Sequence, residues 1–323
     1  MNLESLLRRL GRKKGESTYR EYERHIRYFD KWFDGSIFDA TGFDIDDNVD
    51  HMLEQGYSVS SVYVRRAALS EFYKEAVRAE LVSENPIENS TQLSEWKEIK
   101  DREKQKKYSS KGDVPYLTPE KVDTLAKNAP KPTLRNELII RMLAQTGMRR
   151  GEICQLKLSD GTWGEAGDFE VGPPRTIRIR GETTKSGEGR VVGWRESLDW
   201  YLQQWLENYR HLAAKAPESE YLFPTSRSNH IDPQVVERAV KVAAENAGMQ
   251  SVDQVTKNGQ ERMRVTPHIL RHSFAMACID NGWDIYALKE ALGHSSVDIT
   301  ESTYLHDAEE VVIRHFEQNG PSM

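Results

Sequence analysis

The stretch LRNELIIRMLAQTGMRRGEI, residues 134–153, joins an apolar helix pattern to an abrupt turn and the start of a second helix. The first helix is expected to end at Gly147, and the next to begin at once, which places Arg149 at the junction. A guanidinium near a helix N-terminus is well placed to bind a phosphate group through two hydrogen bonds. The alternative is that Arg149 or Arg150 is an ordinary surface arginine. The apolar residues of the pattern are Leu134, Leu138, Ile139, Met142 and Leu143.

Three further helix starts share one device, a capping residue followed by proline at the first helical position. They are Thr118-Pro119, Asp232-Pro233 and Thr266-Pro267. The helix after Asp232 is expected to end at Gly248 and to bury one apolar stripe. The residues of that stripe are Val235, Val236, Ala239, Val240 and Ala243.

A short hairpin is expected between these helices. Residues 176–180, TIRIR, alternate apolar and basic side chains, and glycines separate them from Val191 and Val192. This pattern is typical of a β-hairpin. The preceding GTWGEAGDFEVGPP, residues 161–174, is interpreted as a loop because it is rich in glycine and proline.

The first part of the chain is expected to be all-helical. Aromatic and apolar side chains recur at three- and four-residue steps over residues 19–33, and a longer pattern covers residues 59–77. The pair Asn85-Pro86 is expected to stop the last of these helices. The sequence therefore predicts a mainly α protein with a small antiparallel β-sheet. Its parts are an all-helical domain over residues 1–95, a basic linker over 96–115, and a mixed, mostly helical domain over 116–323.

Composition agrees with two soluble domains. The chain has 323 residues, of which 37% are hydrophobic and 30% charged, and no apolar run approaches the roughly 20 residues that span a bilayer. The N-terminus lacks the apolar core of a secretory signal, so we expect a cytoplasmic protein and no membrane association. Cys154 and Cys278 form no metal-binding or disulfide pattern, and both are expected to be packing residues.

The net charge of −6 argues weakly against nucleic acid as a partner, because many DNA-binding domains are basic. Phosphate contact depends more on local clusters of Lys and Arg than on the charge of the whole chain. One basic cluster lies within residues 8–14 and another runs from Lys97 to Lys107. The second is either a solvated surface or a linker that lies along a phosphate backbone.

Two more motifs carry groups suited to proton transfer. Lys185 is the lysine of the hairpin tip TTKSGEGR, where it could protonate a leaving oxygen or simply be a solvated turn residue. His268 and Arg271, in TPHILR, share one face of a helix. The positive end of the helix dipole favours a neutral His268 that can accept a proton, although the histidine could equally cap the turn.

The last motif is LGHSS, residues 292–296, followed by Tyr304. Gly293 is expected to close one helix, and Ser295 with Asp298 to open the next, so that His294 is held in the turn between them. Taken alone, Tyr304 could be an ordinary half-buried ring.

Together these motifs resemble the tyrosine recombinases, also called the phage integrase family. The matching features occur in the family's order: TG-x-R-x-x-E at Thr146–Glu152, the basic hairpin with Lys185, H-x-x-R at His268–Arg271, LGH at Leu292–His294, and then Tyr304. The resemblance covers essentially the whole chain and indicates a simple two-domain architecture like that of the Xer proteins. It implies a helical, SAM-like core-binding domain before the catalytic domain.

The resemblance also implies a role for each residue. Arg149, Arg271 and His294 would hold the scissile phosphate. Tyr304 would attack it to form a 3′-phosphotyrosyl link, His268 would take the proton of Tyr304, and Lys185 would protonate the leaving 5′ oxygen. Glu152 would orient Arg149 or His268. The chemistry would need no metal and no cofactor, because the phosphotyrosine conserves the energy of the broken bond.

The implied partners are double-stranded DNA recombination sites and further copies of the chain. A tetramer on two sites is expected, joined through the C-terminal tail, with an accessory or paralogous recombinase as a further candidate partner and a nucleoid-associated location. The candidate DNA-binding residues are Arg65, Arg66, Lys104, Lys106 and Lys107.

Three rival interpretations remain at this stage. They are a type IB topoisomerase-like relaxase, a DNA-binding accessory protein that has lost catalysis, and a helical scaffold whose matches are due to chance. Each expected catalytic position holds the expected residue type, which disfavours the second, and the ordered set of matches disfavours the third.

Overall fold

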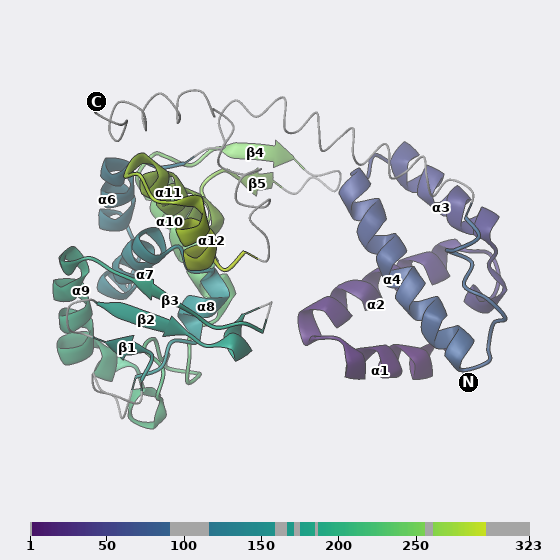
Figure 1. Ribbon diagram of the computed structural model, residues 1–323, viewed down its shortest axis with the longest axis horizontal. Coiled ribbons are helices and arrows are strands. Elements are labelled where there is room, and N and C mark those ends of the chain that lie inside the picture. Colours follow the sequence, from purple (N-terminus) through teal and green to yellow (C-terminus); the bar gives the residue numbers. More distant parts are fainter. Residues whose placement is uncertain are drawn as a thin grey trace, which may run out of the picture. The chain divides into compact units, whose positions relative to one another are not determined.

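The computed structural model describes residues 2–90, 116–158, 167–170, 175–184, 187–255 and 261–294 (Figure 1). The chain divides into two compact units, Met1–Ser110 and Lys111–Met323, which we call the N-terminal unit and the C-terminal unit. The expected linker over residues 96–115 lies outside the described residues. The domain boundaries at 95 and 116 therefore stay predictions.

The N-terminal unit is built from helices, and the two that the sequence predicted are confirmed. The second of them ends at Arg78 and not at Asn85-Pro86 as expected. The chain leaves the helix just after it, where Glu80 adopts a positive φ of 55° that cannot continue a right-handed helix. The elements are α1 (Leu3–Lys13), α2 (Glu16–Trp32), a 3₁₀ turn (Ile37–Asp39), α3 (Gly42–Glu54) and α4 (Val59–Arg78).

One apolar core holds α1, α2 and α4 together. Phe29 of α2 and Phe72 of α4 are almost fully buried in it, and burial of a side chain of this size contributes about 1.5–3 kcal/mol. The hydroxyl of the buried Tyr73 donates to the carbonyl of Ile37 over 2.7 Å, which satisfies the one polar atom of that ring. This core makes α2 and α4 a fixed scaffold for the side chains between them.

The C-terminal unit is also mostly helical, so the predicted fold class, mainly α with a small antiparallel sheet, is confirmed. Helices begin at all three predicted proline positions, and the side chains of Thr118 and Asp232 accept backbone hydrogen bonds as N-caps. The helices are α6 (Pro119–Lys127), α7 (Thr133–Thr146), α8 (Arg150–Cys154), α9 (Asp199–Gln204), α10 (Pro233–Asn246), α11 (Pro267–Asp280) and α12 (Ile285–Leu292).

Helix α7 lies at the centre of this unit. It packs against α6, α10 and α11, and its residues Leu138, Ile139 and Met142 are fully buried. In α10 the predicted apolar stripe is buried except at Val235, where the prediction was wrong. Val235 is 42% exposed because it lies about 100° around the helix from its buried neighbour Val236.

The predicted hairpin is confirmed. Strand β2 (Thr176–Ile179) pairs antiparallel with β3 (Arg190–Gly193), with Ile177 opposite Val192. Strand β1 (Phe169–Glu170) adds to β2, so the prediction of a loop was wrong for these two residues. Phe169 is buried against Trp194, with 6.0 Å between the ring centroids, and this contact accounts for a strand in a glycine-rich stretch.

A second small sheet was not predicted from the sequence. Strands β4 (Val252–Val255) and β5 (Glu261–Met263) form an antiparallel pair just before α11. Separately, none of the helices in the described ranges combines the length and the apolarity needed to cross a bilayer.

Candidate active site

Arg149 lies where the sequence predicted, between two helices. α7 ends at Gly147, which has a φ of +63°, and Arg149 is the N-cap residue of α8. Its backbone N–H donates to Oε2 of Glu152 over 2.7 Å, and its Nη1 donates to Oε1 of the same carboxylate over 3.0 Å. Glu152 therefore fixes both the backbone and the guanidinium of Arg149, as expected for a supporting residue.

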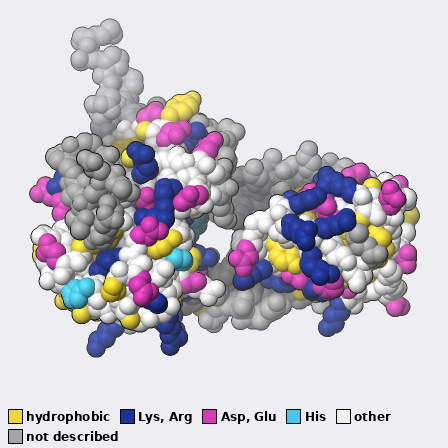
Figure 2. Space-filling view, turned by 90° about the horizontal axis from the view of Figure 1, so that it is seen from below, with side chains coloured by type: hydrophobic (Ala, Val, Ile, Leu, Met, Phe, Trp, Pro, Cys, Tyr) yellow, Lys and Arg dark blue, Asp and Glu magenta, His cyan; other side chains and the backbone are white. Residues whose placement is uncertain are grey.

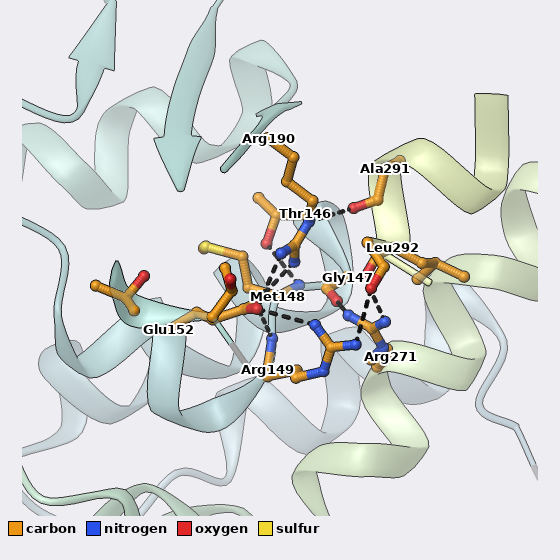
Figure 3. A network of polar contacts seen from close by, with 12 residues as sticks. Thr146, Gly147, Met148, Arg149, Glu152, Arg190, Arg271, Ala291 and Leu292 are labelled. Carbon is orange, nitrogen blue, oxygen red and sulfur yellow. Dashed lines mark hydrogen bonds and ion pairs between the residues drawn. The ribbon is translucent and has the colours of Figure 1, made fainter. Parts of the chain in front are cut away.

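Glu152 has a second cationic partner, Arg190, which is not among the predicted site residues. Nη1 and Nη2 of Arg190, on β3, donate to its two carboxylate oxygens over 2.9 and 2.7 Å (Figure 3). Burial would raise the pKa of Glu152, but the hydrogen bonds and charges of Arg190 and Arg149 hold it below the usual value. The carboxylate is therefore ionised at neutral pH.

Arg271 is buried between two helix ends. Its side chain is on α11 and is only 3% exposed. Nη1 donates to the carbonyl of Gly147 over 2.7 Å, and Nη2 donates to the carbonyl of Leu292 over 2.5 Å (Figure 3). These two bonds fix the plane of the guanidinium between the C-termini of α7 and α12.

Gly147 allows the end of α7 to pack closely against α11. Its φ of +63° lies in the left-handed region that side chains disfavour, and a Cβ at this position would lie 2.4 Å from the ring of Phe274 on α11. A glycine is thus required both by the turn and by the helix packing that brings its carbonyl to Arg271.

His268 and His294 lie beside the same arginines. His268 is in the first turn of α11, and its pKa is lowered by burial and by the positive charges of Arg271 and Arg149. His294 follows Gly293, which ends α12, and its backbone N–H donates to the carbonyl of Lys289 over 3.2 Å. Burial, Arg271 and Arg149 lower the pKa of His294 to about 4, with smaller contributions from Arg190 and His268.

The structure therefore brings together Arg149, Arg271, His268 and His294, four of the six predicted catalytic residues. Arg149 and Arg271 bond adjacent carbonyls just before His294, and their charges lower the pKa of both histidines. The four groups therefore form one electropositive site, in which both imidazoles are neutral at neutral pH. Guanidinium groups held in this way are suited to bind an anion, and a neutral imidazole can accept a proton. Within the described part of the chain, no group of three or more His, Cys, Asp or Glu is arranged to hold a metal ion.

The other two predicted catalytic residues, Lys185 and Tyr304, lie outside the described residues. The same holds for Lys104, Lys106 and Lys107. Their roles stay predictions.

Arg65 and Arg66, the two remaining candidates for DNA contact, lie on α4. Arg65 is 4% exposed, and its Cζ lies 3.6 Å from the ring centroid of Tyr28. Arg66 is partly exposed, and burial lowers the pKa of its guanidinium. Arg65 thus packs inside the N-terminal unit, which does not fit the expectation of a direct phosphate contact.

Arg190 is the site residue that sequence reasoning missed. Its position at the start of β3 follows the predicted hairpin tip, and the alternation of that strand places it on the same face as the buried Val192. A basic residue on the buried face of a short strand was the available signal, because such a charge needs an acidic partner nearby.

Sequence comparisons match both units. The profile described as the phage integrase family matches residues 115–310, and the profile described as the N-terminal SAM-like domain of phage integrases matches residues 3–80. The tyrosine recombinase XerD of Rhizobium meliloti is 27% identical over 332 residues, covering 95% of this chain and 91% of XerD. The tyrosine recombinase XerA of Pyrococcus furiosus is 33% identical over 188 residues, which cover 57% of this chain and 55% of XerA.

Solved structures show the same fold. The Tn1549 transposon integrase in complex with transposon right end DNA has a TM-score of 0.67 at 17% identity, covering 99% of this chain and all of the other. The XerH site-specific recombinase bound to its difH substrate has a TM-score of 0.65 at 19% identity, covering 95% of this chain and 81% of the other.

Proposed function

The chain belongs to the phage integrase family, and on this premise we propose that it is a site-specific DNA recombinase that works through a covalent bond between DNA and Tyr304. The observation that carries the proposal is the cluster of Arg149, Arg271, His268 and His294 around the ends of α7 and α12. Helices from distant parts of the sequence contribute to this one electropositive site, which has the chemistry needed to hold a phosphodiester.

Arg149, Arg271 and His294 bind the scissile phosphate in this mechanism. Cleavage develops negative charge on the non-bridging oxygens, and preorganised donors stabilise that charge most effectively. The donors of Arg149 and Arg271 are fixed by carboxylate and carbonyl partners before DNA arrives. An incoming phosphate would raise the pKa of His294 and favour its protonated, donating form.

The covalent step moves two protons. The Oη of Tyr304 forms a bond to phosphorus while the bond from phosphorus to the 5′ oxygen breaks. His268 takes the proton of the tyrosine, and its lowered pKa keeps the imidazole neutral and ready to accept it. Lys185 gives a proton to the leaving 5′ oxygen. In the second half of the reaction, a 5′ hydroxyl from another strand attacks the phosphotyrosine and releases Tyr304.

This sequence of steps uses no metal ion and no nucleotide cofactor. The phosphotyrosine has the same bond type as the phosphodiester that it replaces, so rejoining needs no outside energy source. Glu152 takes no part in bond making and orients Arg149 through the hydrogen bonds described above.

The proposed partners are double-stranded DNA sites and other copies of the chain. Lys and Arg side chains gather on one face of the N-terminal unit, which suits a phosphate backbone (Figure 2). The basic residues Lys104, Lys106 and Lys107 are proposed to contact the same DNA. Four protomers would assemble on two sites through the C-terminal tail, and deletion of residues 307–323 should weaken that assembly while single-site binding persists.

A nicked suicide substrate tests the proposed function. The protein is incubated with nicked duplexes made from the DNA that flanks its gene, and covalent adducts are detected on denaturing gels. We expect an adduct with the native chain and with the control Tyr286→Phe, a residue that is 63% exposed, but none with Tyr304→Phe. An adduct that persists in Tyr304→Phe would refute the assignment of the nucleophile. Relaxation of supercoiled plasmid without exchange between two sites would instead indicate a topoisomerase-like activity.

A further inference from the structure

Arg190 has no role in the catalytic set proposed above, yet its side chain makes three hydrogen bonds within the site. Its Nη1 and Nη2 hold the carboxylate of Glu152, and its Nε donates to the carbonyl of Ala291 in the last turn of α12 over 2.8 Å. The side chain is 6% exposed. A guanidinium this deeply buried does not reach DNA, so any effect on the reaction has to pass through its neighbours.

The end of α12 gathers three arginines from three different elements. The carbonyls of Ala291 and Leu292 accept hydrogen bonds from Arg190 and Arg271 (Figure 3). The next carbonyl, that of Gly293, accepts one from Arg149. The C-terminus of a helix carries the negative end of its dipole and unsatisfied carbonyls, so it attracts cations. Here three consecutive carbonyls act as a template that sets the spacing of the guanidinium groups.

Arg190 also connects this template to Glu152. The carboxylate receives two bonds from Arg190 and two from Arg149, and it is 2% exposed. Arg149 alone would leave the carboxylate oxygens of Glu152 partly unsatisfied. A buried carboxylate with too few donors moves or takes up a proton. The orientation of Arg149 therefore depends on Arg190.

The turn after α12 is shaped to admit Arg190. Gly293 has a φ of +63°, and a Cβ at this position would lie 3.0 Å from Cδ and 3.1 Å from Nη1 of Arg190. A glycine at 293 thus serves the packing of Arg190 as well as the turn. His294 follows directly, so the same contact fixes the start of the histidine-bearing segment.

We infer that Arg190 is a positioning residue, which holds Glu152 and the end of α12 so that Arg149 and His294 meet the scissile phosphate in the correct geometry. This inference rests on the proposed recombinase function. Arg190 joins three motif-bearing elements, the start of α8, the hairpin strand β3 and the end of α12, into one rigid unit.

The test compares Arg190→Lys with a matched control, Arg178→Lys. Lysine keeps the positive charge beside Glu152 but cannot donate to both carboxylate oxygens and to Ala291 in the arginine geometry. Arg178 lies on β2 of the same hairpin and is exposed. We expect Arg190→Lys to slow adduct formation about a hundredfold, as misplacement of a site group by about 1 Å does, and Arg178→Lys to change it less than about threefold.

A modified substrate separates positioning from a general loss of structure. A methylphosphonate at the scissile position lacks one charged oxygen, so its cleavage depends less on Arg149. The defect of Arg190→Lys should shrink to less than about tenfold on this substrate, as should the defect of Arg149→Lys, because both act on the same charge stabilisation. Thermal unfolding of each variant shows whether it is folded, and Arg190→Met provides a second variant of similar length.

The outcomes distinguish the inference from the function on which it rests. An Arg190→Lys variant that is folded and cleaves like the native chain overturns the inference alone. A folded variant whose defect is equally large on both substrates also overturns it, because Arg190 would then act on some other step. If the native chain forms no adduct with either substrate, the proposed function fails as well.

Discussion

Both units bury an arginine beside a histidine, Arg65 beside His25 and Arg271 beside His294, but these two arginines are held in different ways. Arg65 of the N-terminal unit lies over the ring of Tyr28, and its Nη1 has no hydrogen-bond partner within the described part of the chain. Arg271 of the C-terminal unit donates to two main-chain carbonyls. Aromatic rings attract a cation through their faces with little demand on the direction of its N–H groups, whereas carbonyls fix the guanidinium plane.

This difference suggests different roles: Arg65 contributes to packing, whereas Arg271 is preorganised to bind an anion. Arg65 is 4% exposed and Arg271 is 3% exposed, so burial does not distinguish them. What distinguishes Arg271 is that its partners are the ends of two helices, each held by its own core. A charge fixed in direction before substrate arrives stabilises a transition state without reorganisation, whereas a charge resting on rings stabilises the fold.

The histidines beside these arginines, His25 and His294, also cannot be distinguished by their pKa values. The pKa of His25 is lowered to about 4 by burial and by the charges of Arg65 and Arg24, and that of His294 is lowered to a similar value by burial and by Arg271 and Arg149. A strongly lowered pKa therefore marks a buried histidine near cations in either unit. The geometry of the partners, and not the pKa, is what supports the proposal of a phosphate site beside His294.

The largest expected effect comes from Arg271→Lys compared with Arg65→Lys. A lysine cannot bridge the carbonyls of Gly147 and Leu292 while it presents a donor to phosphate, so adduct formation should fall by a factor of about 10²–10³. Arg65→Lys should change the rate by less than about tenfold, since lysine keeps the cation over Tyr28. Single-turnover cleavage of the nicked duplex measures both rates, and equal losses would show that Arg65 and Arg271 do not differ in their effect on catalysis.

The second prediction concerns the anchor that holds Arg271. Gly147→Ala introduces a Cβ 2.4 Å from the ring of Phe274 at a φ of +63°, so backbone strain and overpacking should together lower the free energy of unfolding by about 3 kcal/mol or more. Gly248→Ala is the control, because Gly248 has a φ of +65° with no atom within 4 Å of the added Cβ. It should lose about 1 kcal/mol, from strain alone.

Denaturant-induced unfolding of the full chain compares these two glycine variants, which lie in the same unit. A similar loss in both would show that the contact of Gly147 with Phe274 on α11 adds nothing beyond the left-handed turn, and that α7 is not held tightly enough to anchor Arg271.

Much of this architecture could be predicted from local patterns. Thr118, Asp232 and the glycines at 147 and 293 mark helix ends through chemistry that acts within a few residues, so those predictions were confirmed. The predicted gathering of Arg149, Arg271, His268 and His294 came from the resemblance to a family and not from spacing. Spacing could not give it, because these residues are up to 145 positions apart and meet only through tertiary packing.

The differences between prediction and structure have physical causes of the same kind. Arg65 is basic and lies on a helix, as a DNA contact would, but Tyr28 and Tyr57 from other segments cover it. Phe169 lies in a glycine-rich stretch, yet its contact with Trp194 makes it part of a strand. Arg190 was missed because its acidic partner, Glu152, is far from it in the sequence. In each case a contact distant in sequence decided the outcome.

The smallest expected effect is on the pKa values of His25 and His294, which phosphate binding should change to different extents. In the free protein both have a pKa near 4, below the ordinary value of 6.5. Since the unfolded chain binds more protons than the native chain between these values, both histidines contribute stability that is complete above about pH 6.5 and is lost as the pH falls toward 4.

DNA should change the pKa of His294 only, because a phosphate placed among Arg149, Arg271 and His294 stabilises the protonated imidazole. We expect its pKa to rise by at least about one unit and that of His25 to stay constant. Imidazole resonances of Tyr304→Phe, titrated with and without the nicked duplex and assigned through His25→Gln and His294→Gln, measure both values. A shift of His25 as large as that of His294 would place phosphate beside Arg65 as well, and the contrast between the two arginines would then fail.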